Sequence, residues 1–480
     1  MTLQDLQPKA LWSNFAALNA IPRASKKETR VISFMKNFGE QLGLPVKVDS
    51  VGNVVIKKPA TAGMENRPTV VLQAHLDMVH QKNADTVFDF DSEGIRSYID
   101  GDWVKAQGTT LGADNGIGVA AIMTLLQSTD IPHPPLEALF TIDEETGMTG
   151  AEGLDASLLS GHIMLNLDSE EDNELTIGCA GGINTFTKLR YLEETPPIGS
   201  TAFAISIKGL KGGHSGIEIH LGRGNANKLM TRLLYRTGKA YELRLASFDG
   251  GSLRNAIPRE AVALVTTTHA TDFLAEFERR KNYIKAEFHS IEPDMAIEIA
   301  ETAMPAKVMS PSDQDKALQA LYAVPNGVFR MSPDIPGLVE TSSSLARVII
   351  KDGEFTSQSL QRSSVESGKE DIVNAVAAAF EAIGAEVSND GSYPGWAPNP
   401  DSKVLRVMEG LYADLFGEKP HVAACHAGLE CGIIGKHYPG MDMISFGPTI
   451  KHPHSPDEKV HIPSVEKFWR YLQAALQRMN

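Results

Sequence analysis

The pattern of apolar and polar positions changes character twice along the chain. In the first third, Thr69–Gln73, Leu136–Ile142 and Ile163–Leu167 are apolar on both faces, which is typical of strands buried in the middle of a parallel sheet. Helical periodicity at Lys9–Leu18 and Glu28–Leu42 precedes them. This mixture predicts an α/β domain built around a mainly parallel sheet.

After Gly178–Gly182 the pattern becomes that of a different domain. Predicted strands such as Thr201–Ile207 and Ala261–Thr268 now alternate between apolar and polar residues, as half-exposed strands do. We expect a separate α+β domain inserted into the first one. Its amphipathic helices are predicted at Asn225–Tyr235, Phe273–Phe288 and Lys316–Tyr322, and a second strand-and-helix unit at Leu338–Ile350 and Asp371–Ala382.

The last segment returns to the first pattern. A helix at Lys403–Leu415, a strand at Met441–Phe446 and a closing helix at Val465–Met479 are predicted there. The sequence therefore predicts one α/β domain formed by residues 1–185 and 397–480, and an inserted α+β domain formed by residues 186–396.

Length and charge agree with a two-domain soluble protein. The chain has 480 residues, which is long for a single core. It carries 45 Lys plus Arg and 60 Asp plus Glu, a formal charge of −15, which argues against nucleic acid or an anionic membrane as a partner. We find no basic-then-apolar leader at Met1–Ile21 and no apolar run near the ~20 residues that span a bilayer. We therefore expect a cytoplasmic protein.

The three cysteines, Cys179, Cys425 and Cys431, are too few and too scattered for a disulfide framework. Their spacing also lacks the Cys-x-x-Cys pattern of a zinc knuckle. We expect small, buried residues in a reducing compartment.

Metal-seeking side chains follow each of four predicted strands. Ligands of open α/β sheets bind beyond the carboxyl ends of the strands, so we expect these side chains to meet. They are His75 and Asp77 after Thr69–Gln73, Asp143, Glu144 and Glu145 after Leu136–Ile142, Asp168, Glu170 and Glu171 after Ile163–Leu167, and His452 and His454 after Met441–Phe446.

Two further features bear on this cluster. Asp114 lies in a glycine-flanked turn just before a predicted helix, Ile117–Gln127, where a carboxylate serves either as a helix cap or as a ligand. Glu144 and Glu145 are adjacent, and successive side chains at a strand end point in opposite directions. One of them can therefore hold a metal while the other faces a substrate.

Imidazole and carboxylate ligands without thiolate suit Zn²⁺, with Mn²⁺ or Co²⁺ as substitutes. Two such ions about 3.5–4 Å apart would activate a water between them and polarise a carbonyl. The expected reaction is metal-assisted hydrolysis, in which a neighbouring carboxylate accepts a proton from water and returns it to the leaving amine.

The ordered set of His-x-Asp, a turn Asp, a Glu pair, an Asp and a late His resembles the M20 family of co-catalytic metallopeptidases. The segments Gly209–Gly216, Asn255–Pro258 and His426–Gly432 look like the bacterial aminoacyl-histidine dipeptidase branch of that family, which cleaves Xaa-His dipeptides such as carnosine. This resemblance covers essentially the whole chain.

The resemblance implies a role for each residue of the cluster. Of the two late histidines we favour His454, because the family's histidine lies a few residues ahead of an acidic residue, as His454 does ahead of Asp457. Asp77 would orient His75, and Glu144 would be the general base and acid. The implied ligands of two Zn²⁺ per subunit are Asp114 as the bridge, His75 and Asp168 on one ion, and Glu145 and His454 on the other.

Residues of the inserted domain are implied to bind the substrate. His214 would reach an active site, often across a dimer, and stabilise the tetrahedral oxyanion; an isolated histidine in such a glycine-rich loop is otherwise structural or exposed. Asn255 would bind the same intermediate or the substrate backbone, or it is a turn residue. Gly428 would let backbone approach the substrate terminus, or it only permits a turn.

The free carboxylate of a dipeptide also needs a cationic partner, for which a guanidinium is well shaped. Arg362 is our candidate, and Arg347 and Arg330 compete with it. A solvated surface arginine remains the alternative for each.

We therefore expect a cytoplasmic di-zinc dipeptidase that hydrolyses unblocked dipeptides and prefers a C-terminal histidine. By resemblance, the inserted domain is its lid and dimerisation domain, and the protein is a homodimer. The nearest alternatives are a tripeptidase or an amidohydrolase acting on N-acyl amino acids. A non-catalytic binding protein on this scaffold would have been marked by loss of Glu144 or of a ligand, yet every expected position is filled.

Overall fold

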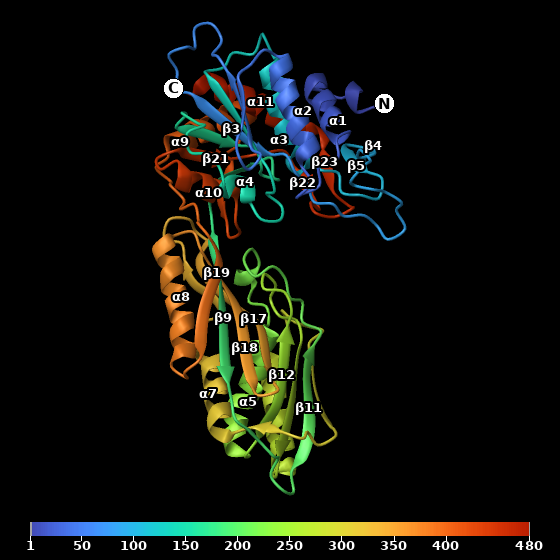
Figure 1. Ribbon diagram of the computed structural model, residues 1–480, viewed down its shortest axis with the longest axis vertical. Coiled ribbons are helices and arrows are strands. Elements are labelled where there is room, and N and C mark those ends of the chain that lie inside the picture. Colours follow the sequence, from blue (N-terminus) through green and yellow to red (C-terminus); the bar gives the residue numbers. More distant parts are fainter. Residues whose placement is uncertain (1, 480) are drawn as a thin grey trace. The chain divides into compact units, whose positions relative to one another are not determined.

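The computed structural model describes residues 2–479; Met1 and Asn480, the ends of the first predicted domain, lie outside this range. The chain divides into two compact units (Figure 1). Unit 1 comprises the residues up to Gly178, Pro398–Ala424 and the residues from Leu429 onward, and unit 2 comprises Cys179–Ala397 and Cys425–Gly428. The short segment Cys425–Gly428 thus groups with unit 2, although the residues on both sides of it belong to unit 1.

An eight-stranded sheet organises unit 1. Its four central strands, β6, β3, β7 and β21, run parallel, whereas β2 and β8 join them antiparallel. The order across the sheet is β1 (Val46–Val48), β2 (Val54–Lys58), β6 (Leu136–Thr141), β3 (Val70–His75), β7 (Ile163–Asn166), β21 (Asp442–Ser445), β8 (Glu174–Cys179) and β20 (His421–Cys425).

The central strand β3 has the burial pattern of a strand in a parallel sheet. All six residues of β3 are buried, as expected for a strand that is covered on both faces. The single amide in this strand, Gln73, is satisfied internally, because its Nε2 donates to Glu430 Oε2 at 2.7 Å and to Thr141 Oγ1 at 3.1 Å. A buried polar side chain is tolerated when it has such partners.

Helices cover this sheet. Helix α3 packs against β3 and α1, and α9 packs against β21 and α11. Within α3, Asp114 and Asn115 have non-helical dihedral angles, so the regular helix begins only after them and Asp114 lies in the turn before it. The helices of unit 1 are α1 (Lys9–Asn19), α2 (Thr29–Gln41), α3 (Ala113–Gln127), α4 (Thr149–Glu152), α9 (Lys403–Phe416), α10 (Glu430–His437) and α11 (Ile462–Arg478).

A second, small sheet holds the late histidine segment in place. Its order is β22 (Ile450–Lys451), β23 (Lys459–His461), β5 (Trp103–Ala106) and β4 (Ser97–Asp100), all antiparallel. The loop that carries His454 connects β22 to β23, and β5 leads into the turn that carries Asp114. This sheet therefore joins two site segments that are distant in sequence.

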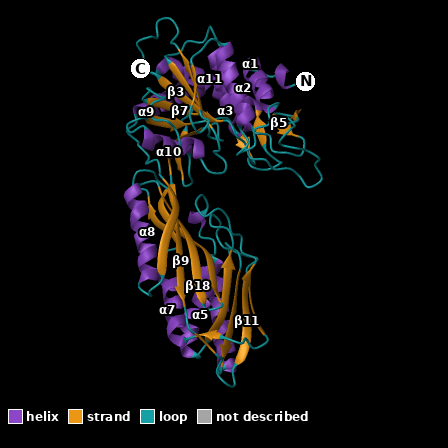
Figure 2. Cartoon of the chain, in the orientation of Figure 1, coloured by secondary structure: helices purple, strands orange, loops and turns teal. Residues whose placement is uncertain are grey.

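Unit 2 is built on a nine-stranded sheet (Figure 2). Neighbouring strands pair antiparallel, which fits the alternating pattern of the sequence. The order is β14 (Ala296–Glu301), β11 (Thr201–Lys208), β13 (Ala261–Thr267), β12 (Arg244–Gly251), β17 (Val339–Lys351), β18 (Glu354–Ser363), β9 (Gly181–Arg190) and β19 (Glu386–Tyr393), and β16 (Gly327–Met331) pairs with β17. The short strands β10 (Glu193–Glu194) and β15 (Val308–Met309) form a separate pair.

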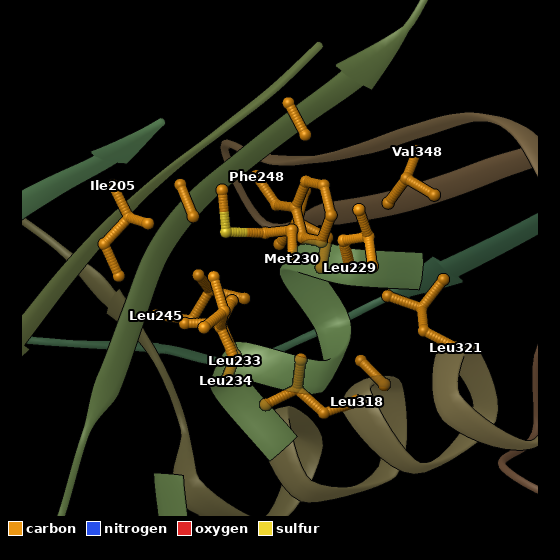
Figure 3. Close-up of a cluster of buried hydrophobic side chains, with 14 of the residues drawn as sticks. Ile205, Leu229, Met230, Leu233, Leu234, Leu245, Phe248, Leu318, Leu321 and Val348 are labelled. Atoms are coloured by element: carbon orange, nitrogen blue, oxygen red, sulfur yellow. The ribbon is translucent and has the colours of Figure 1, made fainter. Parts of the chain in front are cut away.

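Four helices share one apolar core with this sheet. They are α5 (Ala226–Ala240), α6 (Ala270–Phe288), α7 (Pro311–Ala323) and α8 (Glu366–Glu381). Figure 3 shows Met230 of α5 beside Phe248 of β12, and Leu318 of α7 and Val348 of β17 belong to the same cluster. Asn225 caps α5, since its side chain accepts from the amides of Asn227 and Lys228.

The predicted fold class, a mainly parallel α/β domain with an inserted α+β domain, is confirmed. The glycine-rich Ala424–Gly435 region contains the start of helix α10, and the turn-rich Asn389–Pro400 region begins within the strand β19. Among the described residues no helix is both long and apolar enough to span a membrane.

Candidate metal centre

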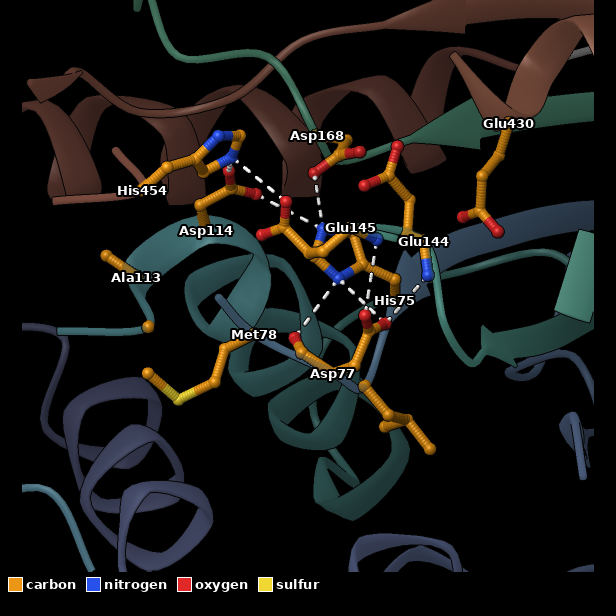
Figure 4. A network of polar contacts seen from close by, with 12 residues as sticks. His75, Asp77, Met78, Ala113, Asp114, Glu144, Glu145, Asp168, Glu430 and His454 are labelled. Atoms are coloured by element: carbon orange, nitrogen blue, oxygen red, sulfur yellow. Dashed lines mark hydrogen bonds and ion pairs between the residues drawn. The ribbon is translucent and has the colours of Figure 1, made fainter. Parts of the chain in front are cut away.

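The carboxyl ends of β3, β6 and β7, the turn before α3 and the loop between β22 and β23 bring the predicted ligands together (Figure 4). His75 ends β3, Glu144 and Glu145 follow β6, and Asp168 follows β7. Their ligand atoms form three groups, within each of which all atoms lie within 4.8 Å of one another. The groups are His75, Asp114 and Asp168; Asp114, Glu145 and His454; and His75, Glu144 and Glu145.

Asp114 is the residue shared between the two histidines. Its Oδ1 lies 3.2 Å from Nε2 of His75, and its Oδ2 lies 3.3 Å from Nε2 of His454. The other neighbours are Asp168, whose Oδ1 is 3.4 Å from His75 Nε2, and Glu145, whose Oε2 is 3.0 Å from His454 Nε2. One carboxylate thus lies between two matching sets of one imidazole and one further carboxylate.

Asp77 supports the site from behind. It is fully buried, and its Oδ1 lies 3.4 Å from Nδ1 of His75. Its carboxylate also accepts from the amides of Glu144 at 3.0 Å and Glu145 at 3.2 Å. Asp77 therefore fixes both the imidazole of His75 and the backbone of the glutamate pair, as an acceptor behind a ligating histidine does.

Charge and burial shift the pKa values of this cluster. Burial raises the pKa of Asp168 to about 7. Hydrogen bonds that the ring donates to the carboxylates of Asp114 and Glu145 raise the pKa of His454 to about 11. Although burial favours the neutral imidazole, Asp168 and Asp114 raise the pKa of His75 well above its usual value. These shifts describe a pocket of strongly negative potential that favours cations.

The surroundings of Glu144 affect how tightly it holds a proton. Burial, reinforced by the carboxylates of Asp168 and Glu430, raises the pKa of Glu144 well above its usual value. A carboxyl group that holds a proton more tightly is suited to accept one and return it near neutral pH. Glu144 also belongs to the third group with His75 and Glu145, so it lies beside the other side chains of the site.

The donor set fits divalent cations. It contains imidazole and carboxylate and no thiolate, which suits Zn²⁺, Mn²⁺ or Co²⁺. Asp168 Oδ1 and Glu145 Oε1 are buried and have no hydrogen-bond partner within the described range. Buried carboxylate oxygens without a donor are costly, and a bound cation would satisfy both.

The other acidic and histidine candidates lie outside the three groups. Glu171 pairs with Lys451, and burial raises the pKa of Glu170 to about 8. His452 and His454 do not alternate as strand residues, because β22 ends at Lys451 and both histidines have positive φ angles of 56° and 59°.

Sequence reasoning missed the segment between α1 and α2. The Ser25 hydroxyl donates to Asp77 Oδ2 at 2.8 Å, and Lys26 pairs with Asp143, which precedes the glutamate pair. Arg23 donates to the carbonyls of Leu76 and Asp77. No spacing or periodicity marked this segment, because its contacts are made in three dimensions to loops far along the chain.

His214 and Asn255 lie on neighbouring segments of unit 2. His214 forms an isolated bridge with Ala256, and the amide of Ser215 donates to the carbonyl of Asn255 at 2.8 Å. Nδ1 of His214 accepts from the amides of Gly216 and Ile217 at 3.1 and 3.0 Å. Burial and the charge of Arg362 lower the pKa of His214 to about 4. The imidazole is therefore neutral at pH 7, and its proton is on Nε2.

Of the three arginine candidates, Arg362 keeps donors for a ligand. It is 5% exposed, its Nη1 donates to the Tyr393 hydroxyl at 2.7 Å, and its buried Nε has no partner within residues 2–479. Arg347 is held by Asp249 and the carbonyl of Gly251, and the exposed Arg330 pairs with Glu340 at 3.3 Å. A Cβ on Gly216 would lie 2.9 Å from Arg362 Nε, so the His214 loop approaches this guanidinium.

The segment containing Gly428 also carries a buried histidine. His426 is 7% exposed, and its Nε2 lies 2.8 Å from the hydroxyl of Ser342. A Cβ on Gly216 would lie 2.3 Å from the carbonyl oxygen of His426. The His214 loop, Arg362 and the segment that continues to the half-buried Gly428 therefore converge within unit 2.

The burial of His426 predicts how stability depends on pH. Burial, with the charge of Arg362, lowers the pKa of His426 to about 3, whereas an unfolded histidine titrates near 6.5. Between these values the unfolded chain binds one more proton, so stability falls as the pH falls below 6.5. Replacing His426 should make the decrease in the free energy of unfolding between pH 6.5 and 5.5 smaller by about 1 kcal/mol. We expect urea unfolding of metal-free His426→Asn to lose less stability than wild type over this range; equal losses would contradict the burial of a neutral imidazole.

Comparison with known proteins shows the family of this chain. Peptidase family M20/M25/M40 matches residues 71–478. The chain is 45% identical over 479 residues to the cytosol non-specific dipeptidase of Escherichia coli strain K12, covering 99% of both chains.

Solved structures agree with this match. The crystal structure of aminoacylhistidine dipeptidase from Vibrio alginolyticus superposes with a TM-score of 0.95 at 46% identity, covering 100% of this chain and 98% of that one. Aminopeptidase PepT from Bacillus cereus, at 16% identity and a TM-score of 0.57 over 99% of both chains, shares the fold. The chain belongs to peptidase family M20/M25/M40 and is a hydrolase that acts on peptide bonds.

Proposed function

We propose that this protein is a two-zinc dipeptidase that hydrolyses the peptide bond of unblocked dipeptides, Xaa-His dipeptides among them. The observation that carries the proposal is the arrangement of two histidine and carboxylate sets around the single carboxylate of Asp114. Mn²⁺ or Co²⁺ would substitute for Zn²⁺ in such a donor set.

The proposed ligands are the members of the two groups that contain Asp114. Asp114 bridges the ions, His75 and Asp168 hold one, and Glu145 and His454 hold the other. When bound, the two cations would lower the pKa of a water molecule and polarise the substrate carbonyl. The residues themselves supply preorganisation, because Asp77 keeps the His75 ring and the glutamate amides in place.

Glu144 is the proposed proton carrier. Its carboxylate accepts a proton from the attacking water and delivers that proton to the leaving amine nitrogen, so the peptide C–N bond breaks to an amine rather than to an amide anion. The raised pKa of Glu144 supports this role, since a carboxyl of ordinary acidity would hold the proton too weakly near neutral pH.

Unit 2 supplies the proposed substrate-binding groups. The neutral His214 presents an Nε2–H donor, which would stabilise the oxyanion of the tetrahedral intermediate. Asn255, on the neighbouring segment, would bind the same intermediate or the substrate backbone. Arg362 would pair with the substrate carboxylate, which is the charge-assisted contact that its buried and incompletely satisfied guanidinium favours, and Gly428 would let backbone approach the substrate terminus.

The names of the relatives support the substrate class. Two relatives have nearly the same sequence identity to this chain. The Escherichia coli relative is called a non-specific dipeptidase, and the Vibrio alginolyticus relative is called an aminoacylhistidine dipeptidase. We infer that the protein accepts several dipeptides and includes those with a C-terminal histidine. We also propose that it works in the cytoplasm, as the name of the Escherichia coli relative suggests, and as a homodimer formed through the inserted domain.

The proposed ligand roles predict metal content. His454→Ala should retain one of two zinc ions, because it removes a ligand of one ion only, whereas Asp114→Asn should weaken both. Metal content after gel filtration, measured by inductively coupled plasma mass spectrometry, distinguishes the two. Two firmly held ions in both variants would refute the assignment.

The proton-transfer role predicts a separate outcome for Glu144. Glu144→Gln should keep both zinc ions and lower kcat by about 10²–10⁴-fold, since the amide cannot accept the proton. Glu171→Gln, an acidic neighbour that pairs with Lys451, is the matched control and should leave kcat near wild type. Near-wild-type turnover by metal-loaded Glu144→Gln would mean that another group transfers the proton.

Substrate comparison tests the reaction class. Ala-His should be cleaved faster than Ala-Ala-Ala, because cleavage of a dipeptide leaves one residue between the scissile bond and the carboxylate that Arg362 is proposed to hold. It should also be cleaved faster than N-acetyl amino acids, which lack the free amino group of the proposed unblocked substrates. Amino acid release is followed by chromatography of the products. Faster turnover of the tripeptide or of the N-acetyl compounds would favour the tripeptidase or amidohydrolase alternative, and zinc binding without any turnover would favour a binding protein.

A further inference from the structure

Arg23 reaches the metal-site loops from the segment that follows α1. It is 1% exposed. Its Nη1 donates to the carbonyls of Leu76 at 3.1 Å and Asp77 at 3.0 Å, and its Nη2 donates to the carbonyl of Gly112. One planar guanidinium therefore joins the loop after His75 to the turn that carries Asp114, a geometry that the lysine ammonium does not provide.

Glu458 holds the same turn from the other side. This carboxylate is 2% exposed, and its two oxygens accept from four successive amides. The distances to Oε2 are 2.7 Å from Leu111 and 2.9 Å from Gly112, and those to Oε1 are 2.7 Å from Ala113 and 3.3 Å from Asp114. The turn cannot move away from this carboxylate without breaking several charge-assisted hydrogen bonds.

The conformation of the turn allows Arg23 to reach it. Gly112 has a φ angle of 69°, and a Cβ there would lie 2.5 Å from Arg23 Nη2. Glycine is therefore what allows the guanidinium to reach the turn. Asn19 adds a third contact, because its Nδ2 donates to the carbonyl of Leu111 at 3.0 Å.

Neither Arg23 nor Glu458 is a proposed zinc ligand. Both act on backbone groups, which leaves the imidazole of His75 and the carboxylate of Asp114 available. Glu458 also follows His454 by four residues in the loop between β22 and β23. The loop that carries one histidine is thereby tied to the turn that carries the shared carboxylate, and Arg23 ties this turn to the loop after the other histidine.

We propose that Arg23 and Glu458 form a brace that fixes Asp114 between His75 and His454 before any cation binds, so that both are positioning residues for metal affinity. The inference rests on the proposed function only in that the site binds zinc. Burying two charges is costly unless they are paired. Both Nη atoms of Arg23 and both carboxylate oxygens of Glu458 have hydrogen-bond partners, mainly in the loops that the brace positions, whereas the buried Nε of Arg23 has none within residues 2–479.

The brace predicts a loss of affinity at both zinc sites, since Asp114 is shared. Arg23→Lys keeps the positive charge but loses the planar fork, and Glu458→Gln keeps the shape but presents an amide group to two backbone donors. We expect each variant to weaken both zinc-binding steps by about 10–100-fold, measured by competition of zinc with a chromophoric chelator. Because both substitutions loosen one turn, the double variant should lose less than the product of the two single effects.

A matched control separates positioning from general stability. Glu137→Gln alters another buried carboxylate of unit 1 that accepts backbone amides, those of Ser160 at 2.8 Å and Gly161 at 3.0 Å, and it lies at the opposite end of β6 from Glu144. We expect Glu137→Gln to lower the unfolding temperature of the metal-free protein while zinc affinity stays at the wild-type value. Asn19→Ala, which removes a single hydrogen bond to the turn, should weaken zinc binding about 2–10-fold and serves if the charged variants do not fold.

The outcomes separate the brace from the proposed function. Wild-type zinc affinity in Arg23→Lys, Glu458→Gln or Asn19→Ala, with two ions bound to the wild-type protein, would overturn the brace and leave the function standing. Weakening of only one step would also overturn it, because the bridging carboxylate serves both ions. Failure of the wild-type protein to bind two zinc ions would instead refute the proposed function.

Discussion

The crowding of carboxylates around two histidines is the constraint on which the rest of unit 1 depends. Asp114, Glu145 and Asp168 come within ion-pair distance of His75 or His454, in a region where burial alone opposes ionisation. Such a cluster persists only if the surrounding backbone is rigid and positive charge is supplied. The parallel strands β3, β6 and β7 supply the rigidity, since their carboxyl ends meet at one edge of the sheet. Proposed cations, or protons in their place, supply the charge.

The polar residues that surround the cluster follow from the same constraint. Asp77 accepts from both glutamate amides, Ser25 donates to Asp77, and Arg23 and Glu458 hold the turn of Asp114 through backbone groups. Each of these side chains is buried and forms hydrogen bonds with a segment distant in sequence. The site is therefore a junction of loops, in which each loop is held by a side chain from another.

Two histidines of unit 2 are neutral. His214 and His426 are kept uncharged by burial and by the charge of Arg362, so Arg362 remains the principal cation of that region. A neutral Nε2–H donor beside a guanidinium can bind an anionic group without competing for protons.

Features that depend on local sequence patterns could be predicted, whereas features that depend on contacts between distant segments could not. The buried strands that end at His75, near Glu144 and near Asp168 were predictable, because periodicity is local and parallel strands align their ends. The proposed ligand roles came from a family resemblance. Arg23, Ser25 and Glu458 escaped prediction because their partners are carbonyls, amides and carboxylates far along the chain. Helix α10 was not predicted, because its apolar pattern is short and interrupted by glycine.

The central claim is that Asp114 bridges two zinc ions while Glu144 binds neither. Anomalous diffraction from zinc-loaded crystals with a bound dipeptide-like inhibitor tests it most directly. We predict two zinc peaks about 3.5–4 Å apart, both in contact with Asp114, one also with His75 and Asp168 and the other with Glu145 and His454. A single zinc peak, or coordination by Glu144 in place of Asp114, would contradict this account.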